Sequence, residues 1–364
     1  MTRREEEILK LLRENPFINQ EEIARILGIT RSSVGVHIVN LMKKGKIKGR
    51  GYILSADEPE VTVIGGANID IYGFPYEKLR LQDSNPGKVK INVGGVARNI
   101  AENLARLGVA TRLITAIGDD FYGKYIIERC RDAGVNMEEI LTVSGESSSV
   151  YLAVMDEAGD MAVAVAGMDI LNHLSLDFLK KKLSIINSSP VCVVDTNLPV
   201  KSLEFLLDNA RKTVFFLDGV SVTKALKLKE LRGTFYAVKL NKLEAEGVTG
   251  ENLNTEAGLL KAAHFFLDKG IKQVYFTLGA EGVFYANTKS RGKITLPPVQ
   301  PVNTTGAGDA FTAAIVYSYL KGYDIDRAAR FGAAAAILTL LVEETVNPEI
   351  SEEKIKKEME VLGL

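Results

Sequence analysis

The stretch Asn303-Thr304-Thr305-Gly306-Ala307-Gly308-Asp309-Ala310-Phe311 carries the most information about the fold of this 364-residue chain. It runs into a predicted helix that extends to Leu320. The small residues at 306–308 allow backbone N–H groups to converge on one point, and the helix that starts there adds about half a positive charge. This arrangement predicts an anion-binding site, and it suits the charge that develops on a phosphoryl group during transfer.

Asp309 needs a separate explanation, because a carboxylate does not help to bind an anion. Beside an anion site, a carboxylate can accept the proton of an attacking hydroxyl group. The alternative is that Gly306 and Gly308 serve a tight turn and that Asp309 caps the helix. The chain contains neither a Walker loop nor a protein-kinase catalytic loop, so the common templates for phosphate binding do not apply.

A second glycine motif is Val93-Gly94-Gly95-Val96-Ala97-Arg98-Asn99-Ile100-Ala101, which runs into a predicted helix ending at Gly108. Ile100, Leu104 and Leu107 form the apolar stripe of that helix. The two glycines permit a ligand to approach the backbone closely, and Asn99 can hydrogen-bond a hydroxyl group. We expect a small ligand to bind here.

Upstream, Gly66-Ala67-Asn68-Ile69-Asp70 follows the first predicted strand. In open α/β sheets, ligands bind beyond the carboxyl ends of the strands. Asn68 and Asp70 lie two residues apart on a strand and therefore share one face, which makes them a candidate clamp for a diol. The alternative is that Asp70 is an ordinary turn residue.

From residue 61 onward, short apolar strands alternate with helical stretches. The predicted strands are 61–66, 112–117, 191–195, 214–218, 235–240 and 273–277. Bounded by helices, such runs predict a parallel sheet that is buried on both faces. Residues 149–166 differ, because they predict an antiparallel hairpin with strands 150–155 and 161–166. A hairpin of this kind is more typical of a flap over a site than of the main sheet.

The net charge of −1 suggests at first that the protein does not bind nucleic acid. However, residues 1–54 hold eleven Lys and Arg against six Glu, a net charge of +5, so the remaining 310 residues carry −6. Residues 55–60 are polar and contain Pro59, which is typical of a short linker. The exclusion therefore applies to residues 61–364 and not to the basic head.

The head has the pattern of three short helices. Asn15-Pro16 ends the first, Asn19 and Glu22 predict a capping box for the second, and Thr30 caps the third. The predicted core positions are Ile8, Leu11, Leu12, Ile23, Ile26, Leu27, Val34, Ile38, Leu41 and Met42. Strands 46–48 and 52–54 then predict a basic hairpin around Arg50.

This succession resembles a winged helix-turn-helix, with the third helix in a DNA major groove. The candidate contacts to double-stranded DNA are Arg31, Ser32, Ser33, His37 and Arg50. The alternative is a three-helix protein-interaction module with solvated lysines, in which His37 is an ordinary surface residue.

Cys130 and Cys192 are too far apart in sequence for a compact metal cluster, and no apolar signal segment begins the chain. Both features predict a reducing, cytoplasmic environment. The longest apolar run, residues 331–342, is shorter than the ~18 residues that suggest a membrane span. We therefore expect no membrane partner.

Together, Gly94-Gly95…Asn99 and residues 303–309 resemble the two signatures of the ribokinase-like, or PfkB, sugar kinase family. The resemblance covers roughly residues 61–348, and the second signature is highly specific. It implies a three-layer α/β/α fold with a mostly parallel central sheet and a small β lid formed by about 69–93 and 149–166. It also implies ATP-dependent phosphoryl transfer to a primary hydroxyl of a sugar or nucleoside.

The resemblance also implies roles for individual residues. Asp309 corresponds to the catalytic base, and the backbone of Gly306, Ala307 and Gly308 to the anion hole. The implied substrate-binding residues are Asn68, Asp70, Gly94, Gly95, Arg98 and Asn99, although Arg98 also suits a surface position. The implied ATP-binding residues are Asn241, Thr277, Gly279, Gly282, Gly306 and Gly308.

Three further features carry alternatives. Glu244 in Asn241-Lys242-Leu243-Glu244 is implied to organise Mg²⁺, but the same spacing produces a helix capping box. The pattern from Thr277 to Gly282 also occurs in simple hairpin turns. Many relatives have Asp where this chain has Asn303, and that Asp helps to bind a monovalent cation, so potassium activation is in doubt here. The lid implies a homodimer.

Residues 64–70 and 95–104, with the opening Asn303-Thr304-Thr305, are most similar to the pseudouridine kinases of this family. Some bacterial relatives also carry a helix-turn-helix before the kinase. The expected reaction is 5′-phosphorylation of pseudouridine, and ribose or another nucleoside is the alternative substrate. A further alternative is a transcriptional regulator that uses the kinase fold as a ligand sensor, but Asp309 argues against it because a sensor needs no base.

Overall fold

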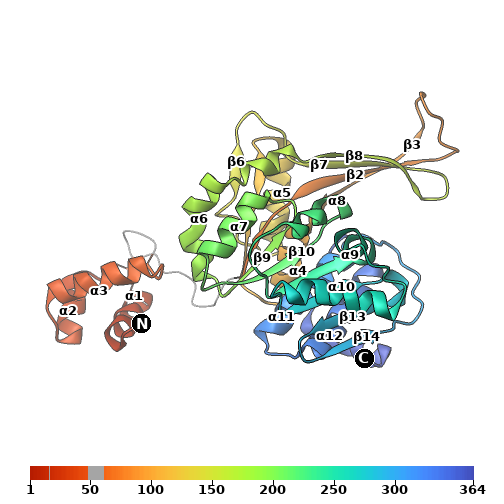
Figure 1. The fold of residues 1–364 in the computed structure, drawn as a ribbon. Coiled ribbons are helices and arrows are strands. Elements are labelled where there is room, and N and C mark those ends of the chain that lie inside the picture. The colour runs from red at the N-terminus through yellow and green to blue at the C-terminus, as the bar shows by residue number, and fades with distance from the viewer. Residues whose placement is uncertain (16, 48–60) are drawn as a thin grey trace. The chain divides into compact units, whose positions relative to one another are not determined.

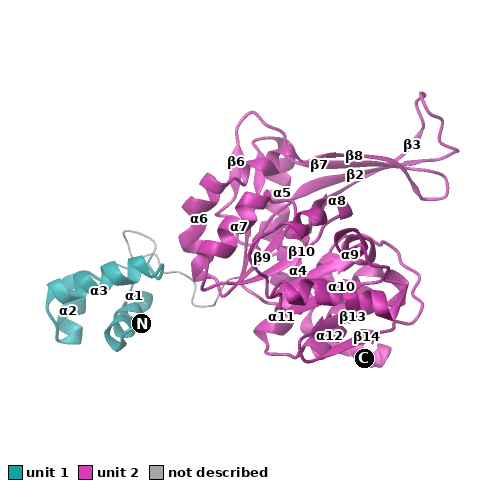
Figure 2. Cartoon of the chain, viewed as in Figure 1, with its two compact units in different colours: residues 1–59 teal, residues 60–364 magenta. Residues whose placement is uncertain are grey.

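The computed structural model describes residues 1–15, 17–47 and 61–364. The chain divides into two compact units, Met1–Pro59 and Glu60–Leu364, which we call the head and the body (Figure 2). Most of the predicted basic hairpin, including Arg50, and the predicted linker 55–60 lie outside the described residues.

The head contains three helices, α1 (Arg3–Glu14), α2 (Gln20–Leu27) and α3 (Arg31–Lys43). Both predicted caps are confirmed. Asn19 Oδ1 accepts the backbone N–H of Glu22 at 2.9 Å, and Thr30 Oγ1 accepts that of Ser33 at 3.2 Å. The core predictions for Ile26 and Met42 are wrong, since these residues are 58% and 43% exposed. Leu41 takes the last core position of α3, and Met42 points away from the small core.

The body is built on an eight-stranded sheet with the order β14-β13-β12-β11-β10-β9-β1-β4 (Figure 1). Its strands are β1 (Val61–Ile64), β4 (Thr111–Ile114), β9 (Val191–Asp195), β10 (Val214–Asp218), β11 (Ala237–Asn241), β12 (Gln273–Thr277), β13 (Val283–Asn287) and β14 (Arg291–Ile294). The strands from β4 to β12 are parallel, and β13 and β14 add antiparallel partners at one edge. The prediction of a mostly parallel sheet is therefore confirmed.

The predicted strands 61–66 and 235–240 differ at their ends from β1 and β11, and the predicted strand 112–117 is wrong in its whole extent. Residues 112–117 were expected to form a single strand, but they contribute to two strands that belong to different sheets. After β4 the chain leaves the main sheet, and β5 (Ala116–Gly118) pairs in parallel with β6 (Leu141–Val143). The break occurs at Thr115, whose carbonyl accepts the N–H of Leu141 at 2.8 Å.

The sheet separates two hydrophobic cores, because successive side chains of a strand point to opposite faces. In β9, Val191 and Val193 belong to one core, and Cys192 and Val194 to the other. The first face is covered by α4 (Val96–Arg106), α5 (Phe121–Asp132), α11 (Ala307–Leu320), α12 (Ile325–Leu340) and α13 (Glu352–Leu362). The second is covered by α6 (Leu176–Ser188), α7 (Val200–Asn209), α8 (Val222–Ala225), α9 (Lys242–Thr249) and α10 (Glu256–Asp268). The body thus has the three expected layers.

A second sheet, which we call the small sheet, has the order β3-β2-β7-β8 and extends away from the main sheet (Figure 1). Its strands are β2 (Asn68–Pro75), β3 (Gly87–Gly94), β7 (Val150–Met155) and β8 (Met161–Gly167). The hairpin predicted over 149–166 is confirmed as β7 and β8, which pair antiparallel. The predicted lid segments form this sheet.

The strand order predicts where a ligand binds the main sheet. β1 lies between β4 and β9, so the chain reverses its direction across the sheet at β1. Ligands of open α/β sheets bind beyond the carboxyl ends of the strands at such a reversal. Within the described ranges, no helix is both long and apolar enough to cross a membrane.

Candidate active site

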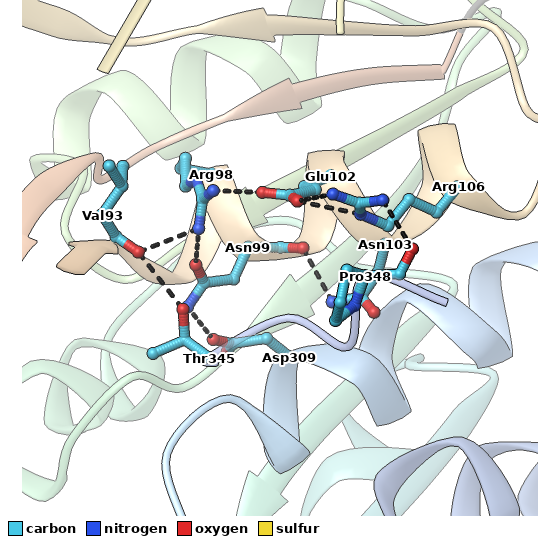
Figure 3. Close-up of polar contacts among 9 residues, drawn as sticks. All are labelled: Val93, Arg98, Asn99, Glu102, Asn103, Arg106, Asp309, Thr345 and Pro348. Atoms are coloured by element: carbon cyan, nitrogen blue, oxygen red, sulfur yellow. Dashed lines mark hydrogen bonds and ion pairs between the residues drawn. The ribbon is translucent and has the colours of Figure 1, made fainter. Parts of the chain in front are cut away.

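The two glycine motifs meet at a hydrogen bond between Asn99 and Asp309. Asn99 lies in the first turn of α4, and Asp309 lies in the first turn of α11. The Nδ2 group of Asn99 donates to Oδ2 of Asp309 at 2.7 Å (Figure 3). Asp309 is 8% exposed. Its carboxylate therefore faces α4, and the structure excludes the simple role of an N-cap, because Gly306 occupies that position.

The start of α11 requires glycine at position 306 and leaves little space for a side chain at position 308. Gly306 has φ +87°, and a Cβ atom there would lie 1.8 Å from the carbonyl oxygen of Thr345. A Cβ atom on Gly308 would lie 2.7 Å from Nζ of Lys239. The first N–H groups of a helix have no carbonyl partner within the helix, so this turn offers free donors above a buried cation.

Lys239 and Asp218 form a buried ion pair beneath these donors, and the sequence analysis missed both residues. Lys239 Nζ lies 3.2 Å from Asp218 Oδ2. The same carboxylate oxygen accepts from the hydroxyl of Thr312 in α11 at 2.7 Å. Burial opposes the charged form of Lys239, but Asp218, Glu244 and Asp309 raise its pKa overall. The cation is therefore held charged at the base of the anion site.

The ionisation of Asp309 is shifted by this environment. Burial raises its pKa most, and the nearby Asp218 carboxylate raises it further. Lys239 and the hydrogen bond from Asn99 oppose the increase, and the resulting pKa is about 7. A carboxylate with a pKa near neutrality accepts a proton more readily than an ordinary aspartate.

Arg98 is buried, so the surface position that we considered for it is wrong. Its guanidinium donates to Val93 O at 2.9 Å and to Asn99 Oδ1 at 2.8 Å, and it pairs with Glu102 (Figure 3). Because Asn99 Oδ1 is occupied by Arg98, its Nδ2 group points at Asp309. Arg98 thus orients the Asn99 amide.

Asn68 and Asp70 begin β2 and share one face, as predicted. Asn68 Nδ2 donates to Asp70 Oδ1 at 2.6 Å. Burial raises the pKa of Asp70 to about 6, against the opposing effects of Asn68 and Arg98. Asp70 pairs in register with Tyr151 of β7, so it is a strand residue and not a turn residue.

The glycine pair lets the second motif approach this strand closely. A Cβ atom on Gly94 would lie 2.1 Å from Asp70 Oδ2, and one on Gly95 would lie 2.5 Å from the carbonyl oxygen of Gly66. Gly66 N–H in turn donates to Asp195 Oδ2 at 2.8 Å, at the end of β9. Asp195 is a further buried carboxylate that the sequence analysis did not identify.

The predicted nucleotide residues lie at the ends of the next strands. Asn241 of β11 and Thr277 of β12 are register partners. Gly279 and Gly282 follow in the turn between β12 and β13, with φ values of +62° and +94°. A Cβ atom on Gly282 would lie 1.9 Å from the carbonyl oxygen of Ile294, which explains the need for glycine there.

Glu244 is part of a capping box, as the alternative interpretation predicted. Its carboxylate accepts Asn241 N–H at 2.8 Å and Asn241 Nδ2 at 2.7 Å, and its own N–H donates to Asn241 Oδ1 at 2.9 Å. Across the described part of the chain, no group of three or more His, Cys, Asp and Glu residues is arranged to hold a metal ion. Each oxygen of Glu244 keeps a second lone pair, which suits contact with a cation through water.

This fold and site define a ribokinase-like sugar kinase, and the comparisons with known proteins agree. A family model described as pfkB family carbohydrate kinase matches residues 58–352, and one described as winged helix-turn-helix DNA-binding matches residues 1–48. The body therefore belongs to the pfkB family of carbohydrate kinases, whose members are phosphotransferases.

Individual relatives extend this assignment. The uncharacterized sugar kinase YeiI of Escherichia coli K12 is 37% identical over 96% of this chain and 97% of its own length. The pseudouridine kinase of the same organism is 36% identical over 80% of this chain and 93% of its own length. The structure of Arabidopsis thaliana ribokinase complexed with ribose and ATP has a TM-score of 0.73 and 24% identity, covering 83% of this chain and 99% of that one. This last likeness shows the fold.

Proposed function

We propose that the body transfers the γ-phosphoryl group of ATP to the 5′-hydroxyl of pseudouridine. The observation that carries the proposal is the buried Asn99–Asp309 pair at the start of α11, beside free backbone donors. The 36% identity to a pseudouridine kinase supports this nucleoside over other substrates.

In the proposed reaction, Asp309 accepts the proton of the 5′-hydroxyl as its oxygen attacks the γ-phosphorus. A new O–P bond forms, the bond to the β–γ bridging oxygen breaks, and ADP leaves. The N–H groups of Gly306, Ala307 and Gly308 face the developing negative charge, and buried Lys239 adds positive potential beneath them. Such donors act strongly because they are fixed before the reaction begins.

ATP is proposed to lie along the ends of β11 and β12, where Asn241, Thr277, Gly279 and Gly282 are found. Glu244 is proposed to hold Mg²⁺ through water, because its carboxylate is buried and already bound to Asn241. When bound, Mg²⁺ neutralises part of the phosphate charge.

The substrate is proposed to lie against the face of the small sheet that carries Asp70. Tyr72 is on this face, and its ring centroid lies 6.5 Å from that of Tyr151. Asn68, Asp70 and Asn99 would bind the ribose hydroxyls, and the aromatic rings offer a wall for a planar base. This wall favours a nucleoside over free ribose.

The test is ATP consumption with pseudouridine, uridine, adenosine, ribose and fructose, each measured as kcat/KM. We expect pseudouridine to be the best substrate. A higher kcat/KM for ribose would support the ribokinase alternative. Binding of pseudouridine by calorimetry without turnover of any compound would contradict the enzyme proposal and support a ligand sensor.

We also propose that the body forms a homodimer through the small sheet. Its face opposite Asp70 carries one apolar row across all four strands, in the register Ile91, Ile71, Leu152, Val165. Val163 and Val165 of β8 are 53% and 63% exposed. An apolar row of this kind favours pairing with a second copy of the chain.

The head supports a second function, binding of double-stranded DNA. The winged helix-turn-helix match over residues 1–48 and the +5 charge of residues 1–54 carry this proposal. Of the predicted contacts, Arg31 is exposed and pairs with Glu21 at 3.2 Å, while the Ser32 and Ser33 hydroxyls lie 3.0 and 2.8 Å from Thr30 Oγ1. His37 is half-buried. Because the two serine hydroxyls contact Thr30 and His37 is partly covered, exposed Arg31 is the most available phosphate contact among the described candidates.

Because Cys130 and Cys192 are both free and buried, we propose that the protein works in the reducing cytoplasm.

A further inference from the structure

The segment before α11 and the segment after α12 are joined by the side chain of Asn303. Asn303 precedes α11, and Glu343 follows α12. The Nδ2 group of Asn303 donates to the carbonyl oxygen of Glu343 at 2.9 Å, and its Oδ1 accepts the N–H of Thr305 at 2.9 Å. A backbone hydrogen bond of 2.8 Å from Val302 N–H to Leu340 O lies beside this contact.

The two partners fix the orientation of the Asn303 amide. The N–H of Thr305 needs an acceptor, and the carbonyl of Glu343 needs a donor, so only one orientation satisfies both. A monovalent cation at this place would need an oxygen of residue 303 to converge with the carbonyl oxygen of Glu343. The structure instead directs an N–H donor at that carbonyl. These residues therefore do not fit the cation site that the family resemblance implies.

The segment that Asn303 holds is in contact with both sides of the site. The carbonyl of Thr345 packs against Gly306, where a Cβ atom would lie 1.8 Å from its oxygen. The hydroxyl of Thr345 donates to Val93 O at 3.2 Å, at the end of β3. Lys90 of the same strand lies 3.1 Å from the carboxylate of Glu343. Residues 343–345 thus connect the small sheet to the start of α11.

We propose that the amide of Asn303 takes the place of a monovalent cation in joining these segments, so that the kinase needs no potassium. In this proposal a neutral hydrogen bond supplies the connection for which the family resemblance implies a carboxylate and a bound ion. The activity part of this inference rests on the proposed kinase reaction, whereas the stability part does not.

The first test compares the full-length protein in KCl, NaCl and choline chloride at equal ionic strength. We expect kcat/KM to agree within about 1.5-fold and the melting midpoint to agree within about 1 °C, because no ion binds the folded state selectively. Activation of the unaltered protein by potassium of about threefold or more would overturn the inference.

The second test uses Asn303→Asp, which places a carboxylate beside the Glu343 carbonyl and recreates a cation site. We expect this variant to lose activity in choline chloride and to regain it in KCl, with a midpoint raised by at least about 2 °C. Asn209→Asp, in the last turn of α7, is the matched control and should respond equally to all three salts.

A third variant distinguishes the effect of an added negative charge from the effect of losing the hydrogen bond to Glu343. Asn303→Ser removes the hydrogen bond to Glu343 without adding charge, so its reduced activity and midpoint should not respond to potassium. A midpoint of Asn303→Asp that is equal in all three salts would contradict the inference. If no substrate is turned over, the proposed function fails, but the melting data still decide whether residue 303 selects for or against a cation.

Discussion

The side-chain nitrogen of Asn99 lies 2.7 Å from a carboxylate oxygen of Asp309, and this contact joins the first turns of two helices that are 210 residues apart. Arg98 donates a hydrogen bond to the oxygen of the same amide, so the amide nitrogen of Asn99 is the group that donates to Asp309. The Asp309 carboxylate is consequently held in place by the N–H donor of Asn99 and not by the proton of a second carboxylic acid. A base that is both buried and oriented is suited to remove a proton from a hydroxyl group.

The first prediction concerns Asp309→Asn, which keeps the shape of the side chain and removes the base. We expect kcat to fall by about 10²- to 10⁴-fold, the usual contribution of a general base, while the Kd for nucleoside changes little. Stopped-time assays of ADP formation and calorimetric binding measure the two effects. Asp208→Asn, at an exposed position of α7, should leave kcat unchanged. A near-normal rate for Asp309→Asn would refute the assignment of the base.

The second prediction follows from the raised pKa of Asp309, which is about 7. The base acts only when it is ionised, so kcat/KM should increase as the pH rises through about 7 and then level off. The free energy of unfolding should change in the opposite direction and decrease as the pH rises. The folded-state pKa lies above the ordinary value of 3.8, so this group favours the folded state at low pH and loses that contribution as the pH rises toward 7.

The measurement for this second prediction is the melting midpoint of Asp309→Asn and of the unaltered protein between pH 5 and pH 8. The variant should be the more stable protein at pH 8, where Asp309 is ionised and buried, and the difference should shrink toward pH 5. A difference that is constant across this range would show that Asp309 does not titrate there.

The sequence predicted the local features of the fold well. The strands at 191–195, 214–218 and 273–277 agree residue by residue, because continuous apolar runs between helices have one stable arrangement. The exit from the sheet at Thr115 could not be predicted, because it depends on a hydrogen bond to Leu141 across 26 residues. Ile26 and Met42 were wrongly predicted to be core residues, because helical periodicity does not say where a small core ends.

The candidate site likewise contains some residues that the sequence indicated and others that it did not. Asn99 and Asp309 lie in recognisable motifs, so the sequence indicated both. Asp195 and Asp218 were missed because a single charged residue at the end of an apolar strand resembles an ordinary strand terminus, and Lys239, in the middle of β11, was missed as well. Their partners come from other strands and from α11, through contacts such as that of Asp218 with Thr312. A charged residue within an otherwise apolar run, such as Lys239, was the signal available.

The third prediction compares two glycines with positive φ. Gly306→Ala would place a Cβ atom 1.8 Å from the Thr345 carbonyl, whereas Gly322→Ala meets no atom within 4 Å. Gly322→Ala should therefore cost about 1 kcal/mol from backbone strain alone. Gly306→Ala should cost more in urea unfolding and should abolish activity. Equal losses in the two variants would show that the contact with Thr345 does not constrain the start of α11.

The fourth prediction concerns the apolar row of the small sheet. Val165→Glu places a charge in the apolar row of the proposed dimer interface, so we expect sedimentation equilibrium to show a monomer. Val361→Glu, at an exposed site of α13, introduces the same charge elsewhere and should leave a dimer. If the unaltered protein sediments as a monomer, or if both variants remain dimers, the small sheet is not the interface.

The last prediction concerns the head, because the net charge of +5 on residues 1–54 is masked in the whole chain by −6 on the remaining 310 residues. If the head binds the DNA backbone, log K should fall linearly with log salt, by about 0.9 for each phosphate that is neutralised. Arg31→Ala should weaken binding and reduce this slope by about one phosphate, because Arg31 is exposed at the start of α3. Fluorescence anisotropy of labelled double-stranded DNA with the full-length protein measures both quantities. Lys124→Ala, which removes a positive charge from α5 of the body, is the matched control and should leave affinity and slope unchanged. An affinity that is independent of salt, or an equal loss in the two variants, would contradict DNA binding through the head.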